Sequence, residues 1–451
     1  MPFYRHHSEK CLPVSPGPLQ SRPEDAEPRR AAGAGGVGRG REVPMFQKLF
    51  PVYRGLPRGD YVLFLSRVVN NLGNVVMPLL ALILTERLGF SKERAGLFTT
   101  LFIAAQPPFI MLGGWLCDRI GGKRVVILFD TLGALMYLVC ACLRPSLTTA
   151  MLIALAACLY SGASAAFNSI VAAITPAEKI NSAYSLNYLG MNLGFTVGPI
   201  LSGLLFGNLT LLFVLDAVTT LAATGITALL LPATPAAAPK ESAQADAPRQ
   251  SLWEVLRRVP VLQVFSAALL LYYLCYMQWS FLLPLQTAGL FGGDRGPLLY
   301  SFTVSINAVC VILLTPVLTH STQRFASAHV IAAGGILYLI SFLMFSVDMR
   351  WPLLFYAAAV VLTLGEILVT INTNSFIALR TPQTHLGRVN SLTTIVSGTG
   401  SALSPMLMGR LLKSVDFRGA WLCVAGVMAL GVLSMGAVNR ADRAWRREER
   451  P

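Results

Sequence analysis

The chain has 451 residues, of which 54% are hydrophobic and only 13% are charged. Soluble domains carry about 25% charged residues, so this composition excludes an ordinary soluble enzyme and a disordered chain and indicates that lipid is the main solvent. The formal charge of +14 is explained by basic loops on the cytoplasmic face of a membrane protein and calls for no nucleic-acid partner.

Residues 1–44 do not follow a membrane pattern. They contain no apolar core of a signal peptide, and their Ala and Gly run is of low complexity. We predict a disordered extension that lies upstream of the true start at Met45. Glu42 and Val43 can be encoded by a purine-rich sequence that resembles a bacterial ribosome-binding site just before that Met.

Twelve apolar runs follow, and an apolar helix of about 20 residues is long enough to cross a bilayer. Gly, Pro and charged residues separate the runs. The predicted spans are 61–85, 96–117, 125–143, 147–173, 183–207, 209–231, 260–288, 297–318, 328–347, 352–379, 391–413 and 419–438.

The longest polar break is rich in Ala and Pro, divides the spans six and six, and is typical of a flexible linker. The predicted units are an N-terminal six-helix bundle over 45–231, a cytoplasmic linker over 232–259, a C-terminal six-helix bundle over 260–440 and a basic cytoplasmic tail over 441–451.

The two halves are related at a constant offset of 206 residues. The segment NSIVAAITP from Asn168 falls on NSFIALRTP from Asn374, and twelve identities lie between residues 168 and 207 and their partners. Because the offset contains six spans, an even number, the halves are parallel repeats about an axis along the membrane normal.

The basic residues of the loops predict the orientation. If the N-terminus is inside, the cytoplasmic segments from Met45 onward hold 19 Lys and Arg residues and the opposite face holds nine. Basic residues accumulate in cytoplasmic loops. Both termini are therefore predicted to lie in the cytoplasm.

The loop after the second span carries a spaced set of residues, namely Gly114, Leu116, Asp118, Arg119, Gly121 and Lys123. Gly114 is expected to let helices approach, and the basic residues hold the loop inside. The pattern resembles the signature of the major facilitator superfamily, with Gly122 where the family has Arg. The resemblance implies alternating access and a charge relay through Asp118 that latches the cytoplasmic side. A plain basic turn is the alternative interpretation.

The fifth span places small residues beside a proline bend, namely Gly194, Gly198, Pro199, Ser202 and Gly203. This resembles a motif associated with drug:proton antiporters, with Ser202 replacing a Gly. Plain helix packing is the alternative, because Gly400, Pro405 and Gly409 echo the pattern in the eleventh span. Such antiporters carry an Arg in the fourth span where this chain has Cys158, so proton coupling does not run through an Arg there.

Polar side chains inside a membrane are costly and are therefore candidates for function. In the first span Arg67, Asn70, Asn71 and Asn74 recur at helical spacing and predict a stripe that faces a water-filled cavity. The other candidates are Tyr160, Ser164, Phe167 and Asn168 in the fourth span, Tyr272, Tyr273, Tyr276, Gln278 and Trp279 in the seventh, and Glu366, Thr370, Thr373 and Asn374 in the tenth. In the superfamily that the sequence resembles, these four helices line the central cavity.

Glu366 lies near the middle of its span and is the strongest candidate for proton or cation coupling, with Arg67 as its counter-charge. A structural ion pair or a buried hydrogen bond is the alternative. Asp130 and Asp216 lie nearer the ends of their spans and are predicted to be structural.

We therefore predict an all-α membrane protein of twelve transmembrane helices in two pseudo-symmetric six-helix bundles, in the bacterial plasma membrane. The expected function is proton-coupled efflux of amphipathic small molecules, as in the twelve-helix drug:proton antiporters that the sequence resembles. A uniporter or proton symporter of a polar metabolite, such as a sugar or an organic anion, is the alternative, favoured by Arg67 and the asparagine stripe.

The sequence offers no support for catalysis. It contains no His and Glu set at metal-ligand spacing, no Gly-x-Ser-x-Gly and no Walker motif, and its eight cysteines form no Cys-x-x-Cys pair. We expect no cofactor and no metal, a proton gradient as the energy source, a small-molecule substrate, and a monomer in the lipid bilayer.

Overall fold

The computed structural model describes residues 53–232, 260–293, 295–322, 324–347, 350–380 and 386–448. The expected N-terminal extension with Met45, and the expected linker after Pro232, lie outside the described residues. All regular structure within the described ranges is helical, and the described helices belong to one compact unit, Val52–Pro451.

The predicted all-α fold with twelve spans is confirmed. Eleven helical segments are long and apolar enough to cross a bilayer. The first span is α2 (Arg58–Leu72), η2 (Met77–Leu79), α3 (Leu80–Leu82) and η3 (Ile83–Arg87), and the seventh is α10 (Pro260–Tyr276) with α11 (Gln278–Phe291). The others are α4 (Lys92–Ile120), α5 (Gly122–Cys142), α6 (Leu147–Ile174), α7 (Ile180–Leu205), α8 (Leu209–Leu230), α12 (Arg295–Thr322), α13 (Ser327–Phe345), α14 (Pro352–Ala378) and α16 (Phe417–Glu448), with η4 (Ala177–Lys179) before α7.

The twelfth long helix, α15 (Leu386–Leu411), has 26 residues and supplies the eleventh span. It is less apolar than the other eleven because it is rich in Ser, Thr and Gly. It packs against α4 and α10, while Ile395, Leu403 and Leu407 are exposed.

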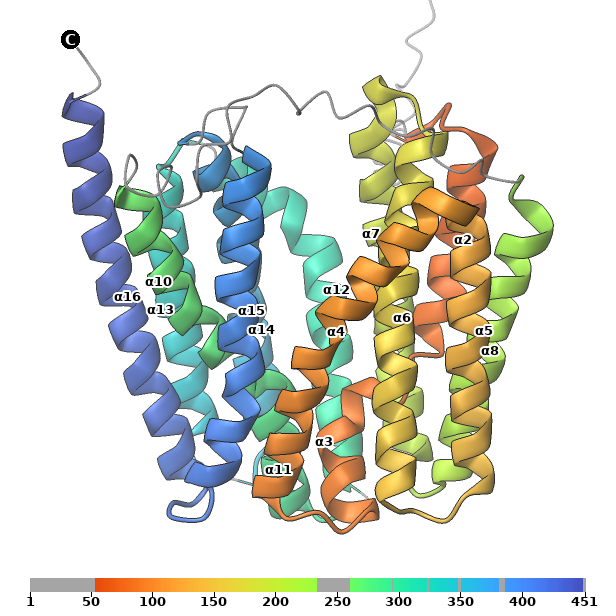
Figure 1. Cartoon of the computed structure of the whole chain (residues 1–451). Helices are drawn as coiled ribbons and strands as arrows, with labels where there is room; N and C mark the ends of the chain where they lie inside the picture. The colour runs from red at the N-terminus through yellow and green to blue at the C-terminus, as the bar shows by residue number, and fades with distance from the viewer. Residues whose placement is uncertain are drawn as a thin grey trace, which may run out of the picture. The chain divides into compact units, whose positions relative to one another are not determined.

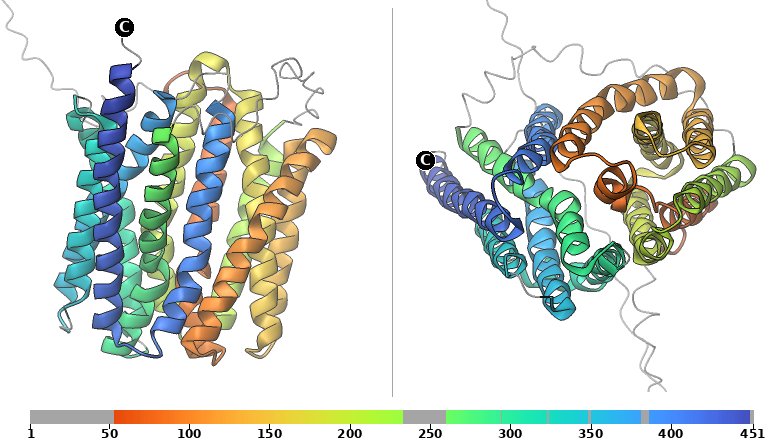
Figure 2. Two further views of the ribbon diagram at one scale, coloured as in Figure 1. Left: turned by 60° about the vertical axis from the view of Figure 1, so that its left-hand side comes forward. Right: turned by 90° about the horizontal axis from the view of Figure 1, so that it is seen from below.

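The helices form two six-helix bundles with the same packing order. In the first bundle α5 packs on α6 and α8, α4 packs on α6, and α2 packs on α7 and α8. In the second bundle α13 packs on α14 and α16, α12 packs on α14, and α10 packs on α15 and α16. Each of these five contacts in the first bundle thus has its counterpart in the second, as the sequence repeat predicts, and the two groups are distinct in Figures 1 and 2.

The bundles meet through α4 with α15, through α7 with α12, and through α11 with α3. The helices α4 and α15 lie together where α4 begins and α15 ends, which we call the closed end, and they diverge toward the opposite, open end (Figures 1 and 2). At the closed end a side chain on Gly96 would collide with the Pro405 carbonyl oxygen. The Thr100 hydroxyl also accepts a hydrogen bond from the Met406 amide at 3.1 Å.

Charged residues tie the same two helices together at the closed end. The Lys413 ammonium lies 2.5 Å from the Glu93 carboxylate, and Arg410 lies 4.0 Å from it. Because both basic side chains are more than 60% exposed, water screens these pairs and each contributes little to stability.

The helix α16 continues past residue 440 and is fixed there by a buried ion pair. Arg380, just after α14, donates to both carboxylate oxygens of Asp442 at 2.5 and 2.7 Å. The Arg380 guanidinium also lies 3.7 Å from the centre of the Phe376 ring. A bidentate pair of this kind fixes the relative position of two helices.

The first span is interrupted between Leu72 and Met77, and a carboxylate satisfies the exposed backbone. Oδ2 of Asp216 on α8 accepts hydrogen bonds from the amides of Val75 and Val76, each at 3.2 Å. The bilayer core offers no water for such groups. This agrees with the structural role predicted for Asp216, and it holds the polar face of α2 in place.

We predict that Asp216→Leu lowers the thermal unfolding temperature strongly, because it leaves two buried amides without an acceptor, at about 1–3 kcal/mol for each. Asp216→Asn keeps an acceptor oxygen and should lower it less. Thermal unfolding of the purified variants in detergent checks this. Equal unfolding temperatures for Asp216→Leu and the wild type would contradict the role.

Candidate functional site

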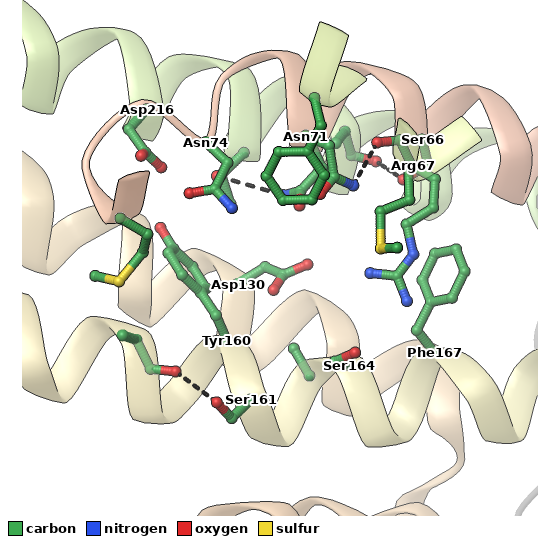
Figure 3. A pocket seen from close by; sticks show the side chains of 18 of the residues that line it. Ser66, Arg67, Asn71, Asn74, Asp130, Tyr160, Ser161, Ser164, Phe167 and Asp216 are labelled. Carbon is green, nitrogen blue, oxygen red and sulfur yellow. Dashed lines mark hydrogen bonds between the residues drawn. The ribbon is translucent and has the colours of Figure 1, made fainter. Parts of the chain in front are cut away.

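The larger of the two cavities described here lies within the first bundle. It has a volume of about 320 Å³ and is lined by all six spans of that bundle. Its polar and charged lining residues are Ser66, Arg67, Asn70, Asn71, Asn74, Gln106, Asp130, Tyr160, Ser161, Ser164, Asp216 and Thr220, and its aromatic and Met residues are Met77, Phe102, Phe167, Met191 and Phe195. Figure 3 shows how these side chains surround the space. The volume lies at the lower end of the range of small-molecule sites.

Two opposite charges face this first cavity. The Arg67 guanidinium lies 4.1 Å from the centre of the Phe167 ring, and Asp130 of α5 points into the same space (Figure 3). They interact electrostatically but form no ion pair, and no salt bridge joins Arg67 to any residue in the described ranges. Asp130 therefore belongs to the cavity lining, where the sequence predicted a structural residue.

The predicted asparagine stripe faces the cavity, and its members differ in what they bind. Asn71 is buried, and its amide donates to the Arg67 carbonyl oxygen at 2.9 Å. The Asn70 amide contacts the Thr220 hydroxyl at 3.4 Å, and Asn74 also lines the space. Asn71 thus makes a hydrogen bond within its own helix, while Asn70 and Asn74 present their polar groups to the cavity.

A second, much smaller cavity lies in the second bundle. It has a volume of about 50 Å³, which is room for one or two water molecules. Its lining consists of Tyr272, Tyr273, Tyr276, Tyr338, Glu366, Val369 and Thr370. Four phenol side chains and one carboxylate therefore define its chemistry.

Glu366 has only neutral hydrogen-bond partners in the described part of the chain. Asn307 of α12 donates to its Oε2 at 2.7 Å and also contacts Thr363 at 2.9 Å. The Tyr276 hydroxyl, at the break between α10 and α11, donates to the same carboxylate.

The predicted counter-charge is not beside Glu366. Arg67 lies in the first cavity, in the other bundle, and the two residues form no ion pair. The pairing expected from the sequence is therefore wrong for this conformation. The pairing fails because Arg67 and Glu366 line separate cavities, each enclosed within its own bundle.

The repeat relates the two cavities position by position. At the offset of 206 residues, Arg67 corresponds to Tyr273 and Tyr160 corresponds to Glu366. Asn70 likewise corresponds to Tyr276. All six residues line their own cavity. The scaffold is therefore repeated, while the chemistry it carries is different in each half.

Five predicted cavity residues line neither of the two cavities, and two of them, Gln278 and Thr373, are buried elsewhere. Trp279 is buried at 5% exposure between Tyr300 and Phe345, so it packs the core. Asn168 and Asn374 are exposed and line neither cavity. Helical spacing placed them on the polar face, but both lie close to the open end of their helices, beyond the enclosed space.

Sequence reasoning did not single out Asn307 and Gln106. Both are polar residues within apolar spans, and this signal alone marks them as candidates. Asn307 holds Glu366, and the Gln106 carbonyl oxygen accepts from the Ser161 hydroxyl at 2.9 Å. Tyr338, in the ninth span, was also missed because a tyrosine in an apolar run is usually a core residue.

The motif that begins at Gly114 has a different packing glycine from the one expected. A side chain on Gly114 would meet nothing within 4 Å, whereas one on Gly113 would collide with the Gly162 carbonyl oxygen. The close approach of α4 to α6 therefore depends on Gly113, and the packing role inferred for Gly114 is wrong.

The rest of that loop shapes the turn between α4 and α5. Gly121 has a φ of +86°, a conformation that side chains strongly disfavour. Lys123 donates to the Leu231 carbonyl oxygen, and the Arg119 guanidinium lies 4.1 Å from the Trp115 ring centre. Asp118 is exposed and forms no ion pair with a described residue.

The small residues of α7 make two contacts. A side chain on Gly194 would lie 2.5 Å from Cβ of Asn71, and one on Gly198 would lie 2.7 Å from the Asn71 carbonyl oxygen. Gly203 instead faces the second bundle, where a side chain would lie 2.7 Å from the Ser301 hydroxyl. Pro199 is buried within the helix. The small residues of the motif thus let the interrupted first span and the neighbouring bundle approach α7 closely.

Two helical bundles that span a membrane and enclose polar cavities define a membrane transporter. The described residues contain no group of three His, Cys, Asp or Glu side chains arranged to hold a metal ion. The sequence profile of the Major Facilitator Superfamily matches residues 63–299 and 276–451. The chain belongs to the Major Facilitator Superfamily and is a secondary transporter.

Relatives and solved structures agree with this assignment. The chain is 25% identical over 402 residues to YttB, an uncharacterized MFS-type transporter of Bacillus subtilis, covering 86% of this chain and 96% of the relative. It is 26% identical over 415 residues to the uncharacterized MFS-type transporter Rv0849 of Mycobacterium tuberculosis, covering 87% and 95%.

Two crystal structures share the fold. The nucleoside transporter NupG has a TM-score of 0.67 at 17% identity, covering 85% of this chain and 99% of NupG. A peptide transporter, POT, in complex with sulfate has a TM-score of 0.68 at 16% identity, covering 86% and 95%. At these identities the likeness concerns the fold alone.

The two neighbouring glycines of α4 provide a matched test of the packing. We predict that Gly113→Ala lowers the thermal unfolding temperature, because the added Cβ meets the backbone of Gly162, which cannot move away without shifting α6. Gly114→Ala should leave it unchanged or raise it slightly, since Ala favours a helix more than Gly does. Fluorescence-detected size exclusion after heating compares them, and an equal loss in both variants would contradict the assignment.

Proposed function

We propose that this protein exports amphipathic small molecules in exchange for protons, with Glu366 as the proton carrier. The observation that supports this most is the setting of Glu366, a carboxylate in a cavity of about 50 Å³ among four tyrosines, with Asn307 and Tyr276 as its hydrogen-bond partners. No cationic side chain among the described residues pairs with its ionised form. A carboxyl with neutral partners keeps a bond to Asn307 or Tyr276 in either protonation state.

The size of each cavity supports a division of labour. The cavity around Glu366 has room for one or two water molecules, which suits a proton and not an organic substrate. The cavity of the first bundle is about six times larger, by 320 Å³ against 50 Å³. Its aromatic and Met side chains offer broad, weakly directional contact to an apolar body, so we assign the substrate to it.

We propose that the open end faces the cytoplasm. The segments expected inside hold the larger share of basic residues, and basic loops stay inside. They connect the helices at the open end. Asp118 lies at this end without an ion pair to a described residue, which agrees with a latch that has been released in the inward-open conformation.

A second function is supported by Arg67. Its guanidinium faces the first cavity without a salt bridge to a described residue, and an unpaired guanidinium attracts carboxylates and phosphates. Together with Cys158 in place of an Arg, this favours a uniporter or symporter of a polar anionic metabolite. The uniporter needs no proton exchange at Glu366.

We predict that Glu366→Gln abolishes proton-driven dye accumulation. In inverted membrane vesicles that acidify their lumen by respiration, the wild type should concentrate at least one dye from a panel of cationic, neutral and zwitterionic fluorescent dyes, and Glu366→Gln should fall to the level of vesicles without the protein. The amide keeps the shape and the hydrogen bonds but carries no exchangeable proton at this site. Transport is followed by dye fluorescence before and after the gradient is collapsed.

Glu178→Gln is the matched control, because Glu178 is an exposed acidic residue between α6 and α7. It should behave as the wild type does. Uptake that depends neither on the proton gradient nor on the residue at position 366 would contradict the antiporter proposal and support the uniporter.

A further inference from the structure

The first cavity presents one positive and one negative group that form no ion pair with each other. Arg67 of α2 and Asp130 of α5 both face the space, and no ion pair joins them. Neither the Arg67 guanidinium nor the Asp130 carboxylate has a side-chain hydrogen bond to a described residue. Charges held apart in a bundle interior are costly unless something pairs with each of them.

The other charged group of this cavity is already engaged. Asp216 accepts two backbone hydrogen bonds from the break in the first span, so it serves the fold. The charges left for a ligand are therefore one guanidinium and one carboxylate, which sum to zero. A purely cationic ligand would leave Arg67 unpaired, and a purely anionic ligand would leave Asp130 unpaired.

The geometry around Arg67 favours a fixed anion partner. The Phe167 ring lies 4.1 Å from the Arg67 guanidinium carbon. Stacking on a ring restricts the orientation of the planar guanidinium and of its N–H donors. Asp130 comes from a different helix, and its carboxylate points into the same space as the guanidinium (Figure 3). Phe102, Phe195 and Met191 complete the lining with apolar surface.

We propose that the substrate is a zwitterion with an apolar body, whose carboxylate binds Arg67 and whose ammonium binds Asp130. This rests on the proposed function and names the substrate class of the same cavity. It also accounts for the two rival functions, since the guanidinium that favours an anion and the lining that favours an amphipathic cation contact two ends of one molecule.

Three small probes of equal shape test the substrate class. They are 4-(aminomethyl)benzoic acid, 4-methylbenzylamine and 4-methylbenzoic acid, which at neutral pH are a zwitterion, a cation and an anion on the same ring. Phenylalanine serves as a zwitterion of shorter charge separation. Binding to the purified full chain in lipid nanodiscs is measured by equilibrium dialysis with radiolabelled compounds.

We expect at least one of the two zwitterions to bind the wild type about tenfold or more tightly than the cation and the anion, which corresponds to about 1.4 kcal/mol. Arg67→Gln should remove the preference over the cation, and Asp130→Asn should remove the preference over the anion. Arg67→Lys keeps the charge and should keep part of the preference.

The wild type alone can overturn the proposal. If it binds the cation or the anion as tightly as both zwitterions, or binds none of the four compounds, the proposal fails without reference to any variant. If Arg67 and Asp130 instead form a purely structural pair, each single variant lowers the unfolding temperature, the double variant Arg67→Gln with Asp130→Asn restores it, and no charge preference appears.

Failure of this proposal is distinguishable from failure of proton coupling. Equilibrium dialysis involves no gradient, so Glu366→Gln should retain the preference for the zwitterion even though its transport is uncoupled. Loss of the preference in Glu366→Gln would contradict the assignment of proton and substrate to separate cavities.

Discussion

The bilayer core contains no water to bind exposed backbone groups, and the arrangement of this protein depends on how two interrupted helices meet that constraint. The first span breaks after Leu72, and Asp216 accepts the two amides that the break exposes. The seventh span breaks at Met277, where the Ser404 hydroxyl donates to the Leu274 backbone carbonyl oxygen and accepts from the side-chain amide of Gln278, each at 2.5 Å. Each break lies next to a cavity. The break in the first span positions Arg67 and Asn74 at the first cavity. The break in the seventh span ends α10 at Tyr276, whose hydroxyl donates to Glu366.

A repeated scaffold carries unequal chemistry in its two halves. Positions related by the repeat line both cavities, yet Arg67 has Tyr273 as its counterpart and Tyr160 has Glu366. A symmetric pair of bundles can rock about one axis, while the function that we propose uses the unequal charges to hold the substrate in one bundle and to carry the proton in the other. The close glycine contacts at the closed end, such as Gly96 against Pro405, permit the two bundles to touch there and diverge at the open end.

Much of the fold was readable from the sequence, because run lengths, polar breaks and the repeat are strong signals in a membrane protein. The stripe of Arg67, Asn70, Asn71 and Asn74 was readable for the same reason, since helical spacing places it on one face. Residue pairing was not readable. Glu366 binds Asn307 of another helix, and Asp130 reaches the first cavity across the bundle, because both contacts depend on helix rotation and tilt. The choice of Gly113 over Gly114 as the packing glycine has the same cause, since adjacent residues on a helix face directions about 100° apart.

The central claim is that the substrate leaves in exchange for protons that Glu366 carries, and the reverse flux tests it most directly. Proteoliposomes that contain the purified protein and a pH-sensitive dye in their lumen are loaded with a substrate that the vesicle assay has shown to be carried, with equal pH on both sides. The account predicts that outward flow of the substrate acidifies the lumen in the wild type and does not do so in Glu366→Gln. Outward flow of the substrate in the wild type with no change of luminal pH would contradict it.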